Sequence, residues 1–454
     1  MTVNTPSLAG LSQEQKREML QRALEKRGTS NGSAKDNDVR AVIDQIPESA
    51  YRFDKFPEYY RLHLQRTLAE NAGIPNPYFR EHDSYGGATT VVDGRNLLNF
   101  GMYNYLGLNG DPRVNAAAMA SIERYGTSAS ASRVVSGERP IHRALEVRLA
   151  ELHEADDAVA FVSGHATNVS VIASLLGSGD LVLHDRLVHN SVMQGAMLSG
   201  ATRQAFPHND WQAVDAILAE SRRRFDKVLI VVEGLYSMDG DICPLDRFVE
   251  IKRRHKALLM VDEAHSMGVL GATGRGAREH FGLASTDVDI WMGTLSKSFA
   301  SCGGYIAGNS ALIELLKLTA SGFVYSVGLP PPMAAAALAS IEIMLAEPER
   351  VATLRANGQL FLNLAKARGL NTGLSQGINV VPVILGQSVL AARLAAMLHE
   401  RGMETPPIIH PAVEERAARL RLFISSLHSK DQIHQAVEMI AEALAEIKPP
   451  KEDL

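Results

Sequence analysis

The chain has 454 residues, of which 46% are hydrophobic and 21% are charged, and its formal net charge is −5. This composition is typical of a soluble globular protein with a large and a smaller domain, and a chain so close to neutral gives no electrostatic reason to expect a nucleic-acid partner. The first ten residues lack the profile of a signal peptide, and no stretch approaches the ~20 apolar residues that span a bilayer. With only Cys243 and Cys302 available, a disulfide framework is excluded, and a cytoplasmic protein with free thiols is expected.

The first part of the chain, residues 1–49, predicts an N-terminal helix and a flexible linker. Ser12 is a good helix N-cap, and Gly28 is a good stop. Residues 29–38 are polar and contain Gly and Ser, as flexible linkers do. Two interpretations remain open: a solvated terminal arm, or a docking helix for a partner with the linker as its tether.

Residues 50–100 predict an arm that becomes extended towards its end. The sequence around residues 50–84 is aromatic and irregular, and residues 88–100 predict an extended chain. Asp93-Gly94 lies between two apolar runs, which is a hairpin signal.

Residues 101–330 predict a large α/β domain. Short apolar segments rich in β-branched residues alternate with helical patterns; these segments are residues 157–163, 180–185, 227–234, 257–264, 288–294 and 303–309. Such alternation indicates a mostly parallel sheet covered on both faces. A long helix then leads into residues 331–454, whose helices and two strands predict a small C-terminal α/β domain.

Function in open parallel sheets collects at the carboxyl ends of the strands, and several polar residues follow these predicted strands. One strand runs into Ser163-Gly164-His165 and then a helix, which suits a phosphate but also suits a tight turn. His189 follows the next strand, and a lone histidine at a helix start is more often structural.

Two later strands end in residues whose side chains are more specific indicators of a catalytic site. Asp262, with His265 three residues on, ends one of them, and a buried acid there needs either an arginine or a protonated heterocyclic nitrogen as partner. Thr294 ends the other, shortly before Lys297. A lysine at the mouth of an apolar strand is usually solvated, but there its pKa can fall and the amine can act as a nucleophile. Together, a phosphate turn, a histidine, an acid and a lysine in this chain order indicate a pyridoxal-phosphate site.

The sequence resembles the α-oxoamine synthase family of fold-type I pyridoxal-phosphate enzymes from about Asn76 to Glu446. The motifs that carry the resemblance are NYLGL, SASRVVSG, SGHATN, DRLVHNS, EGLYSMDGD, VDEAHSMGVLGATGRG, GTLSKSF and ARLRLFISSLH. The resemblance implies the fold-type I architecture, with residues 101–330 as the large cofactor-binding domain, and no metal site.

The resemblance also implies roles for individual residues around the cofactor. Lys297 matches the Schiff-base lysine and later acid/base, Asp262 the partner of the pyridinium nitrogen, and His265 the residue bonded to the cofactor O3′. His189 matches the stacking histidine. The remaining cofactor-binding matches are Gly164 and His165 in the phosphate turn, Thr294, Ser237 near the ring, and Ser326.

Substrate contacts and subunit organisation follow from the same resemblance. Arg421 matches the arginine that binds the amino-acid carboxylate, Asn104 matches a residue that faces the substrate, and Arg80 is a further substrate-binding candidate. Ser326 matches a hydroxyl residue that reaches the phosphate of the neighbouring subunit, which implies a homodimer.

Two positions depart from the family pattern. His165 stands where members usually have Phe or Tyr, and Ala412 stands where a Thr often precedes the RLR strand.

The implied reaction is a decarboxylative Claisen condensation of glycine, alanine or serine with an acyl thioester, carried by coenzyme A or by an acyl carrier protein. Three alternatives remain at this point. The same fold could run another reaction such as transamination, the chain could be a non-catalytic partner subunit, or residues 12–27 could make it chiefly a carrier-protein docking module.

Overall fold

The computed structural model describes Glu18, residues 43–71 and residues 73–447. Apart from Glu18, the helix predicted from Ser12 to Gly28 and the linker after it lie outside the described residues. The chain divides into two compact units, Met1–Asn76 and Pro77–Leu454. The described elements of the first unit are the 3-10 turns η1 (Glu48–Ala50) and η2 (Phe53–Lys55) and the helix α3 (Pro57–Asn71).

No helix in the described part of the chain is both long enough and apolar enough to cross a membrane.

The second unit is built on a seven-stranded sheet with the order β3-β9-β8-β7-β6-β4-β5. Its strands are β3 (Asp157–Phe161), β4 (Leu181–Asp185), β5 (Thr202–Phe206), β6 (Val228–Glu233), β7 (Leu258–Asp262), β8 (Ile290–Thr294) and β9 (Gly304–Gly308). Six of them run the same way, and only β9 is antiparallel to its neighbours β3 and β8. The mostly parallel α/β sheet predicted from the sequence is therefore confirmed, and the reversed direction of β9 is a feature that was not predicted.

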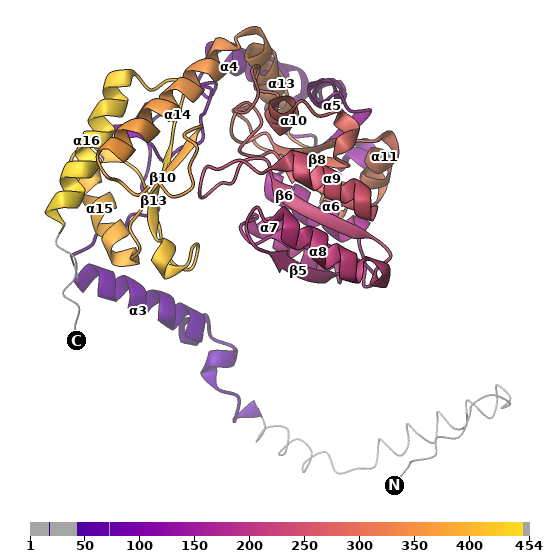
Figure 1. Cartoon of the computed structure of the whole chain (residues 1–454), viewed down its shortest axis with the longest axis horizontal. Helices are drawn as coiled ribbons and strands as arrows, with labels where there is room; N and C mark the ends of the chain where they lie inside the picture. The colour runs from indigo at the N-terminus through magenta and orange to yellow at the C-terminus, as the bar shows by residue number, and fades with distance from the viewer. Residues whose placement is uncertain (1–17, 19–42, 72, 448–454) are drawn as a thin grey trace. The chain divides into compact units, whose positions relative to one another are not determined.

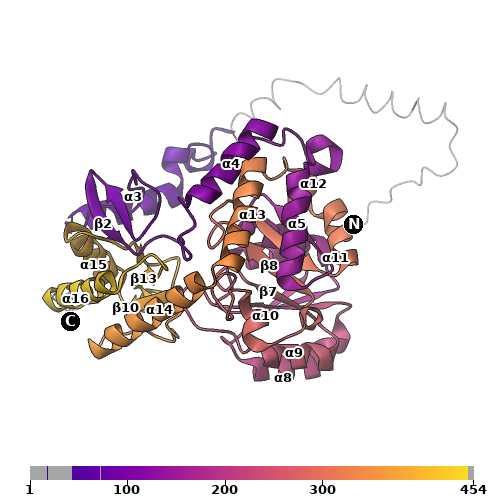
Figure 2. The same cartoon turned by 90° about the horizontal axis from the view of Figure 1, so that it is seen from above.

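Helices cover both faces of this sheet, as the near-continuous apolar strands require. The helices of the large region are α4 (Pro112–Tyr125), α5 (Pro140–His153), α6 (Gly164–Leu175), α7 (Asn190–Ser199), α8 (Trp211–Ser221), α9 (Leu245–His255), α10 (Gly276–Phe281), α11 (Ser310–Thr319), α12 (Ser321–Val324) and α13 (Pro331–Ala346). Short turns complete it, namely η3 (Arg133–Gly137), η4 (Arg222–Arg224) and η5 (Ser285–Asp287). Helices α4 and α5 both pack on α13 (Figure 2).

Alternate side chains along each strand enter two separate cores. Val182, Leu229 and Met260 pack with α6, α7, α11 and α12, whereas Leu183 and Ile230 pack on the opposite face with α5, α8, α9 and α13. This alternation follows from the two-residue period of a strand.

A smaller region follows α13, with helices and strands grouped apart from the large sheet (Figure 1). Its elements are α14 (Glu349–Ala367), β10 (Val380–Ile384), α15 (Ser388–Glu400), β11 (Met403–Glu404), β12 (Pro407–Ile408), η6 (Glu415–Ala417), β13 (Arg419–Phe423) and α16 (Lys430–Glu446). Strands β10, β13 and β12 form an antiparallel sheet. The hairpin predicted at Asp93-Gly94 is confirmed, because β1 (Thr89–Val92) pairs with β2 (Arg95–Asn99) across this dipeptide.

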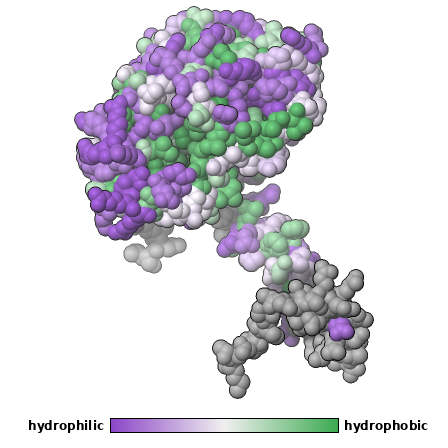
Figure 3. Space-filling view, turned by 90° about the vertical axis from the view of Figure 1, so that its right-hand side faces the viewer, coloured by the Kyte–Doolittle hydropathy of each residue, from purple (hydrophilic) through white to green (hydrophobic). Residues whose placement is uncertain are grey.

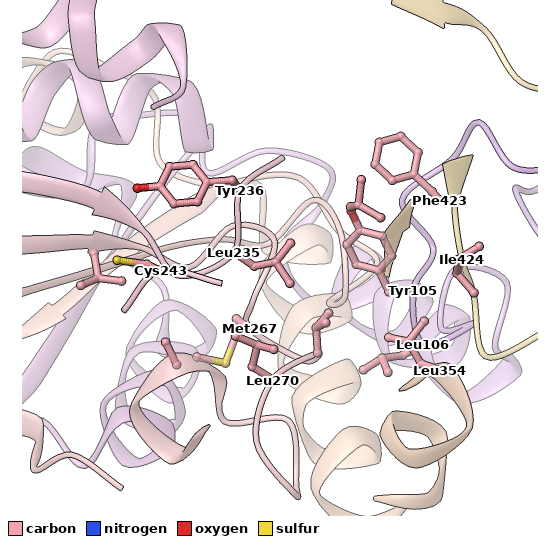
Figure 4. Close-up of a cluster of buried hydrophobic side chains, with 14 of the residues drawn as sticks. Tyr105, Leu106, Leu235, Tyr236, Cys243, Met267, Leu270, Leu354, Phe423 and Ile424 are labelled. Carbon is pink, nitrogen blue, oxygen red and sulfur yellow. The ribbon is translucent and has the colours of Figure 1, made fainter. Parts of the chain in front are cut away.

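The core on one face of the large sheet continues into the smaller region. Figure 4 shows Leu235 and Tyr236 after β6 and Met267 and Leu270 after β7, all in one hydrophobic cluster with Leu354 of α14. Tyr105, Leu106, Phe423 and Ile424 join them. This shared core fixes β13 of the smaller region relative to the carboxyl ends of the large sheet.

Candidate active site

A cavity of about 350 Å³ lies where the carboxyl ends of the parallel strands meet β13. The predicted site residues that line it are Gly164, His165, His189, Ser237, Asp262, His265, Thr294, Lys297 and Arg421. They come from the loops after β3, β4, β6, β7 and β8 and from β13 itself. Residues that are up to 257 positions apart in the chain, from Gly164 to Arg421, therefore meet in one pocket, at the position that parallel sheets use for ligands.

Lys297, three residues after β8, is the amine of the cavity. Its Nζ lies 5.6 Å from the centre of the Tyr103 ring. Burial of the ammonium lowers the pKa of Lys297 to about 8, the carboxylates of Asp262 and Glu233 oppose this, and Arg421 adds to it. A pKa of about 8 leaves ~10% of the amine unprotonated at pH 7, far more than in an ordinary lysine, and a nucleophile or a base requires this form.

Asp262 is held by hydrogen bonds at the end of β7. Its Oδ1 accepts from the backbone N–H of Ala264 (2.9 Å), and its Oδ2 accepts from Nδ2 of Asn168 (2.9 Å). The same amide nitrogen of Asn168 donates to Oγ of Ser191 (3.0 Å). No positively charged side chain pairs with Asp262 among the described residues, so its buried carboxylate is available to a cationic ligand.

His189 is the last residue in this chain of hydrogen bonds. It is the N-cap of α7, and its Nδ1 accepts from the backbone N–H of Ser191 (3.3 Å) and lies 2.7 Å from Oγ of Ser191. Burial lowers the pKa of His189. The ring is therefore neutral at neutral pH and fixed in orientation, as a stacking platform needs to be. The ring of His165 meets it edge-on at 6.2 Å.

His265 is oriented by a tyrosine behind the cavity wall. Its Nδ1 lies 2.8 Å from the hydroxyl of Tyr105, which is fully buried. Burial lowers the pKa of His265 well below its usual value. When the Tyr105 hydroxyl donates to Nδ1 of the neutral ring, the proton of the ring is on Nε2, where it can donate to a ligand.

The turn from β3 into α6 has the geometry of an anion site. Ser163 caps α6, its Oγ accepts from the backbone N–H of Ala166 (3.4 Å), and the first two helical residues are Gly164 and His165. A Cβ atom on Gly164 would lie 2.9 Å from Oγ1 of Thr294, so the backbone can come this close to β8 only as glycine. The helix N-terminus and the Thr294 side chain together form a cradle for a phosphate.

Arg421 projects from β13 towards the loop after β6. Its Nη1 donates to the carbonyl of Ser237 (3.3 Å) and lies 3.3 Å from Sδ of Met238. Its Nε is buried and has no hydrogen-bond partner in the part of the chain that is described. An unsatisfied guanidinium N–H at the cavity suits a carboxylate ligand.

The loop after β6 is also braced from outside the cavity. His208 bonds Asp185 through Nδ1 (3.0 Å) and Asp241 through Nε2 (2.8 Å). Burial would lower the pKa of His208, but these two carboxylates outweigh it and raise the pKa to about 9. Arg419 donates to Oδ1 of Asp239 at 2.7 Å. The loop that carries Ser237 is thus anchored to β4, β5 and β13.

Three predicted site residues do not line the cavity. The amide of Asn104 is buried and donates to the carbonyl oxygens of Gly86 (2.6 Å) and Asn109 (3.2 Å). Arg80 pairs with Glu404 at 3.0 Å and lines a different pocket. Ser326 lies in the partly exposed segment between α12 and α13. Ala412, the position that departs from the family pattern, is exposed and does not line the cavity.

Nine residues that line the cavity were not predicted as site residues, among them Tyr103, Asn168, Ser191, Glu233 and Met238. Glu233 begins the EGLYSMDGD motif at the end of a strand, and Asn168 ends the SGHATN motif of the phosphate turn. Their positions beside predicted site residues could therefore have identified both of them as cavity residues from the sequence.

The chemical groups that line the cavity match those that pyridoxal phosphate needs for binding. It offers a helix N-terminus for a phosphate, a carboxylate without a cationic partner, an amine with a low pKa and an unsatisfied guanidinium N–H. Among the described residues, no group of three or more His, Cys, Asp and Glu side chains is placed to hold a metal ion.

Comparison with known proteins gives consistent matches over most of the chain. The model of the family "Aminotransferase class I and II" matches residues 95–440. An 8-amino-7-oxononanoate synthase of Symbiobacterium thermophilum is 39% identical over 378 residues, which cover 83% of this chain and 96% of that protein. A protein of Desulforudis audaxviator with the name putative 8-amino-7-oxononanoate synthase is 40% identical over 387 residues, covering 84% and 99%. Among solved structures, a serine palmitoyltransferase of S. paucimobilis with a bound PLP–myriocin aldimine has a TM-score of 0.82 and 29% identity, covering 86% of this chain and 99% of that one.

Proposed function

This chain belongs to the α-oxoamine synthases of the aminotransferase class I and II family, and on that premise we propose that it joins a small amino acid to the acyl group of a thioester. The products are an α-amino ketone, CO2 and the free thiol. One C–C bond forms at the α-carbon of the amino acid, the C–S bond of the thioester and the bond to the carboxylate carbon break, and one proton is taken up overall. The observation that carries the proposal is the single cavity in which Lys297, Asp262, His265 and Arg421 meet.

Pyridoxal phosphate is the cofactor, and when bound it supplies an electron sink for the carbanion at the α-carbon of the amino acid. In this proposal the backbone at Gly164 and His165 and the side chain of Thr294 hold its phosphate. The carboxylate of Asp262 would stabilise a proton on the ring nitrogen, and Nε2 of His265 would donate a hydrogen bond to the ring oxygen O3′.

Lys297 and Arg421 act on the amino acid. Arg421 binds the carboxylate through its unsatisfied Nε–H, which fixes the α-carbon beside Lys297. The amine of Lys297, with its pKa of about 8, removes the α-proton and later returns a proton to the product. His189 would stack on the face of the cofactor ring, and its neutral imidazole would add no positive charge there.

The acyl donor and the subunit organisation are further parts of the proposal. Coenzyme A or an acyl carrier protein delivers the acyl group. The second subunit of a homodimer brings its Ser326 to the phosphate. Several large apolar side chains near Ser326 are exposed in the single chain, including Tyr325 at 88% and Val135 at 81%. Figure 3 shows a broad apolar band across one face of the second unit, of the kind that marks protein interfaces. The reaction takes place in the cytoplasm.

The experiment is a visible absorbance titration of the purified protein, loaded with pyridoxal phosphate, with glycine, alanine and serine in turn. We expect one of the three to shift the absorbance of the cofactor, and a later acyl thioester to release CO2 and thiol in equal amounts. Keto-acid formation without either product would indicate transamination instead. A protein that stays colourless with pyridoxal phosphate would support the non-catalytic partner subunit.

A variant separates the chemistry from binding. Lys297→Ala should abolish CO2 and thiol release while the protein still binds the amino acid, because Arg421 is unchanged. Normal turnover by this variant would refute the role of Lys297. Deletion of residues 12–27 tests the docking helix: unchanged use of a carrier-bound acyl group would exclude that role.

A further inference from the structure

Glu233 is a second carboxyl group in the wall of the cavity, and the reaction proposed above gives it no role. It ends β6, in register with Asp262 at the end of β7, so the two acidic residues lie side by side on neighbouring strands. Only 3% of its surface is exposed. No ion pair of the described residues includes Glu233, although a buried carboxyl without a cation is costly.

The two oxygens of Glu233 hold two different loops. Oε1 accepts from the backbone N–H of His189 (2.7 Å), which follows β4, and Oε2 accepts from the backbone N–H of Ser237 (3.2 Å), which follows β6. His189 and Ser237 both line the cavity. One carboxyl group therefore sets the distance between the backbones of two cavity residues on different loops.

The bond to His189 constrains the ring as well as the backbone. His189 is the N-cap of α7, and its side chain is fixed by Ser191 on one side only. With the backbone N–H bound by Glu233 and Nδ1 bound by Ser191, the imidazole has little freedom to tilt. A platform for a planar ligand needs this rigidity, because small displacements of reacting groups lower rates strongly.

We propose that Glu233 is a positioning residue for the reaction, which ties the loops of His189 and Ser237 together and so fixes the histidine ring against the bound cofactor. The proposal rests on the function proposed above, because it assumes that pyridoxal phosphate occupies the cavity.

The charge balance of the cavity agrees with this assignment. Burial raises the pKa of Glu233 well above its usual value, and the neighbouring charge of Asp262 raises it further. The charge of Lys297 and the N–H groups of His189 and Ser237 act in the opposite direction and favour the ionised form, so the two loops that Glu233 holds also stabilise its carboxylate.

The test uses Glu233→Gln, which keeps the size of the side chain but replaces one acceptor oxygen with an N–H donor that faces a backbone N–H. The matched control is Glu263→Gln. Glu263 is also fully buried, follows β7, bonds to Ser266 and to the backbone of Ala277, and does not line the cavity. Both variants are loaded with pyridoxal phosphate, and far-UV circular dichroism and thermal unfolding report folding.

We expect the visible circular dichroism band of bound pyridoxal phosphate to differ between Glu233→Gln and the wild-type protein. In Glu263→Gln the band should be the same as in the wild-type protein. We also expect kcat to fall about 10- to 100-fold in Glu233→Gln, with the KM of the amino acid within about 3-fold. In a His189→Asn background, Glu233→Gln should cost less than about 3-fold, because the ring that it positions is already gone.

Three results would overturn the proposal: an unchanged dichroism band, equal changes in the two Gln variants, or the same loss of kcat with and without the His189 ring. Should Glu233→Gln fail to fold, Glu233→Asp replaces it; the shorter side chain cannot reach both N–H groups and gives the same expectations. The dichroism readout requires only cofactor binding. It therefore tests Glu233 even if the unchanged protein releases no CO2 and the proposed condensation is wrong.

Discussion

Removal of the cofactor leaves Lys297 as a free amine in a cavity that disfavours its ammonium form. Burial lowers the pKa from 10.5 to about 8. At pH 7 a pKa of about 8 leaves ~10% of the amine unprotonated, whereas the ordinary lysine value leaves ~0.03%, a difference of ~300-fold. Lys297 should therefore react with electrophiles at neutral pH far faster than an exposed lysine does.

The assay is modification of the cofactor-free protein with cyanate between pH 6 and pH 10, with peptide mass spectrometry to quantify each lysine. The exposed Lys366 is the internal reference. We expect half-maximal reactivity of Lys297 near pH 8. Asp262→Asn should move this midpoint to lower pH, because the carboxylate of Asp262 raises the pKa, and Arg421→Met should move it to higher pH. A midpoint above pH 10, or shifts of the opposite sign in both variants, would refute the electrostatic reasoning.

Two further predictions concern stability and cofactor binding. The raised pKa of His208, about 9 against 6.5, means that its two carboxylate bonds stabilise the fold fully below about pH 6.5 and are lost as the pH rises through about 9. The contribution is about 3 kcal/mol, so urea unfolding should show a steeper loss of stability above pH 7 in the unchanged protein than in Asp241→Asn, and parallel curves would contradict this. Gly164→Ala should lower the affinity for pyridoxal phosphate about 10-fold or more, because the new Cβ atom would lie 2.9 Å from Oγ1 of Thr294. Fluorescence titration measures this affinity, and Gly177→Ala, with open space around the added Cβ, is the control that should bind normally.

The sequence predicted site residues best where a chemically reactive or charged residue directly follows a clear strand or begins a helix. Asp262 and Thr294 end strands whose apolar pattern is unmistakable, and Lys297 follows the second of them, so their meeting at one sheet edge could be predicted from strand order alone. Gly164 is similar, because a strand, a cap and a helix follow each other within a few residues.

What the sequence could not supply was the choice of partners over long distances. Nothing local shows that the amide of Asn104 is taken up by the carbonyl of Gly86, or that Arg80 pairs with Glu404. Strand β5 was missed because four of its five residues are exposed, which removes the apolar signal. The reversed direction of β9 depends on which strands it pairs with and not on its composition, because an apolar strand has the same composition whether it pairs parallel or antiparallel.

That reversed strand has a consequence for how the protein is made. Strand β3 is at the edge of the large sheet, where β9 is the one described strand that pairs with it. Asp157 pairs with Gly308, so the 150 residues between them are synthesised before the partner of Asp157 exists. At ~5–20 residues per second, a nascent chain carries β3 without a hydrogen-bonded neighbour for roughly 8–30 s on the ribosome. Throughout that interval the strand displays an unpaired apolar edge, which makes the incomplete polypeptide a candidate for chaperone binding and for aggregation.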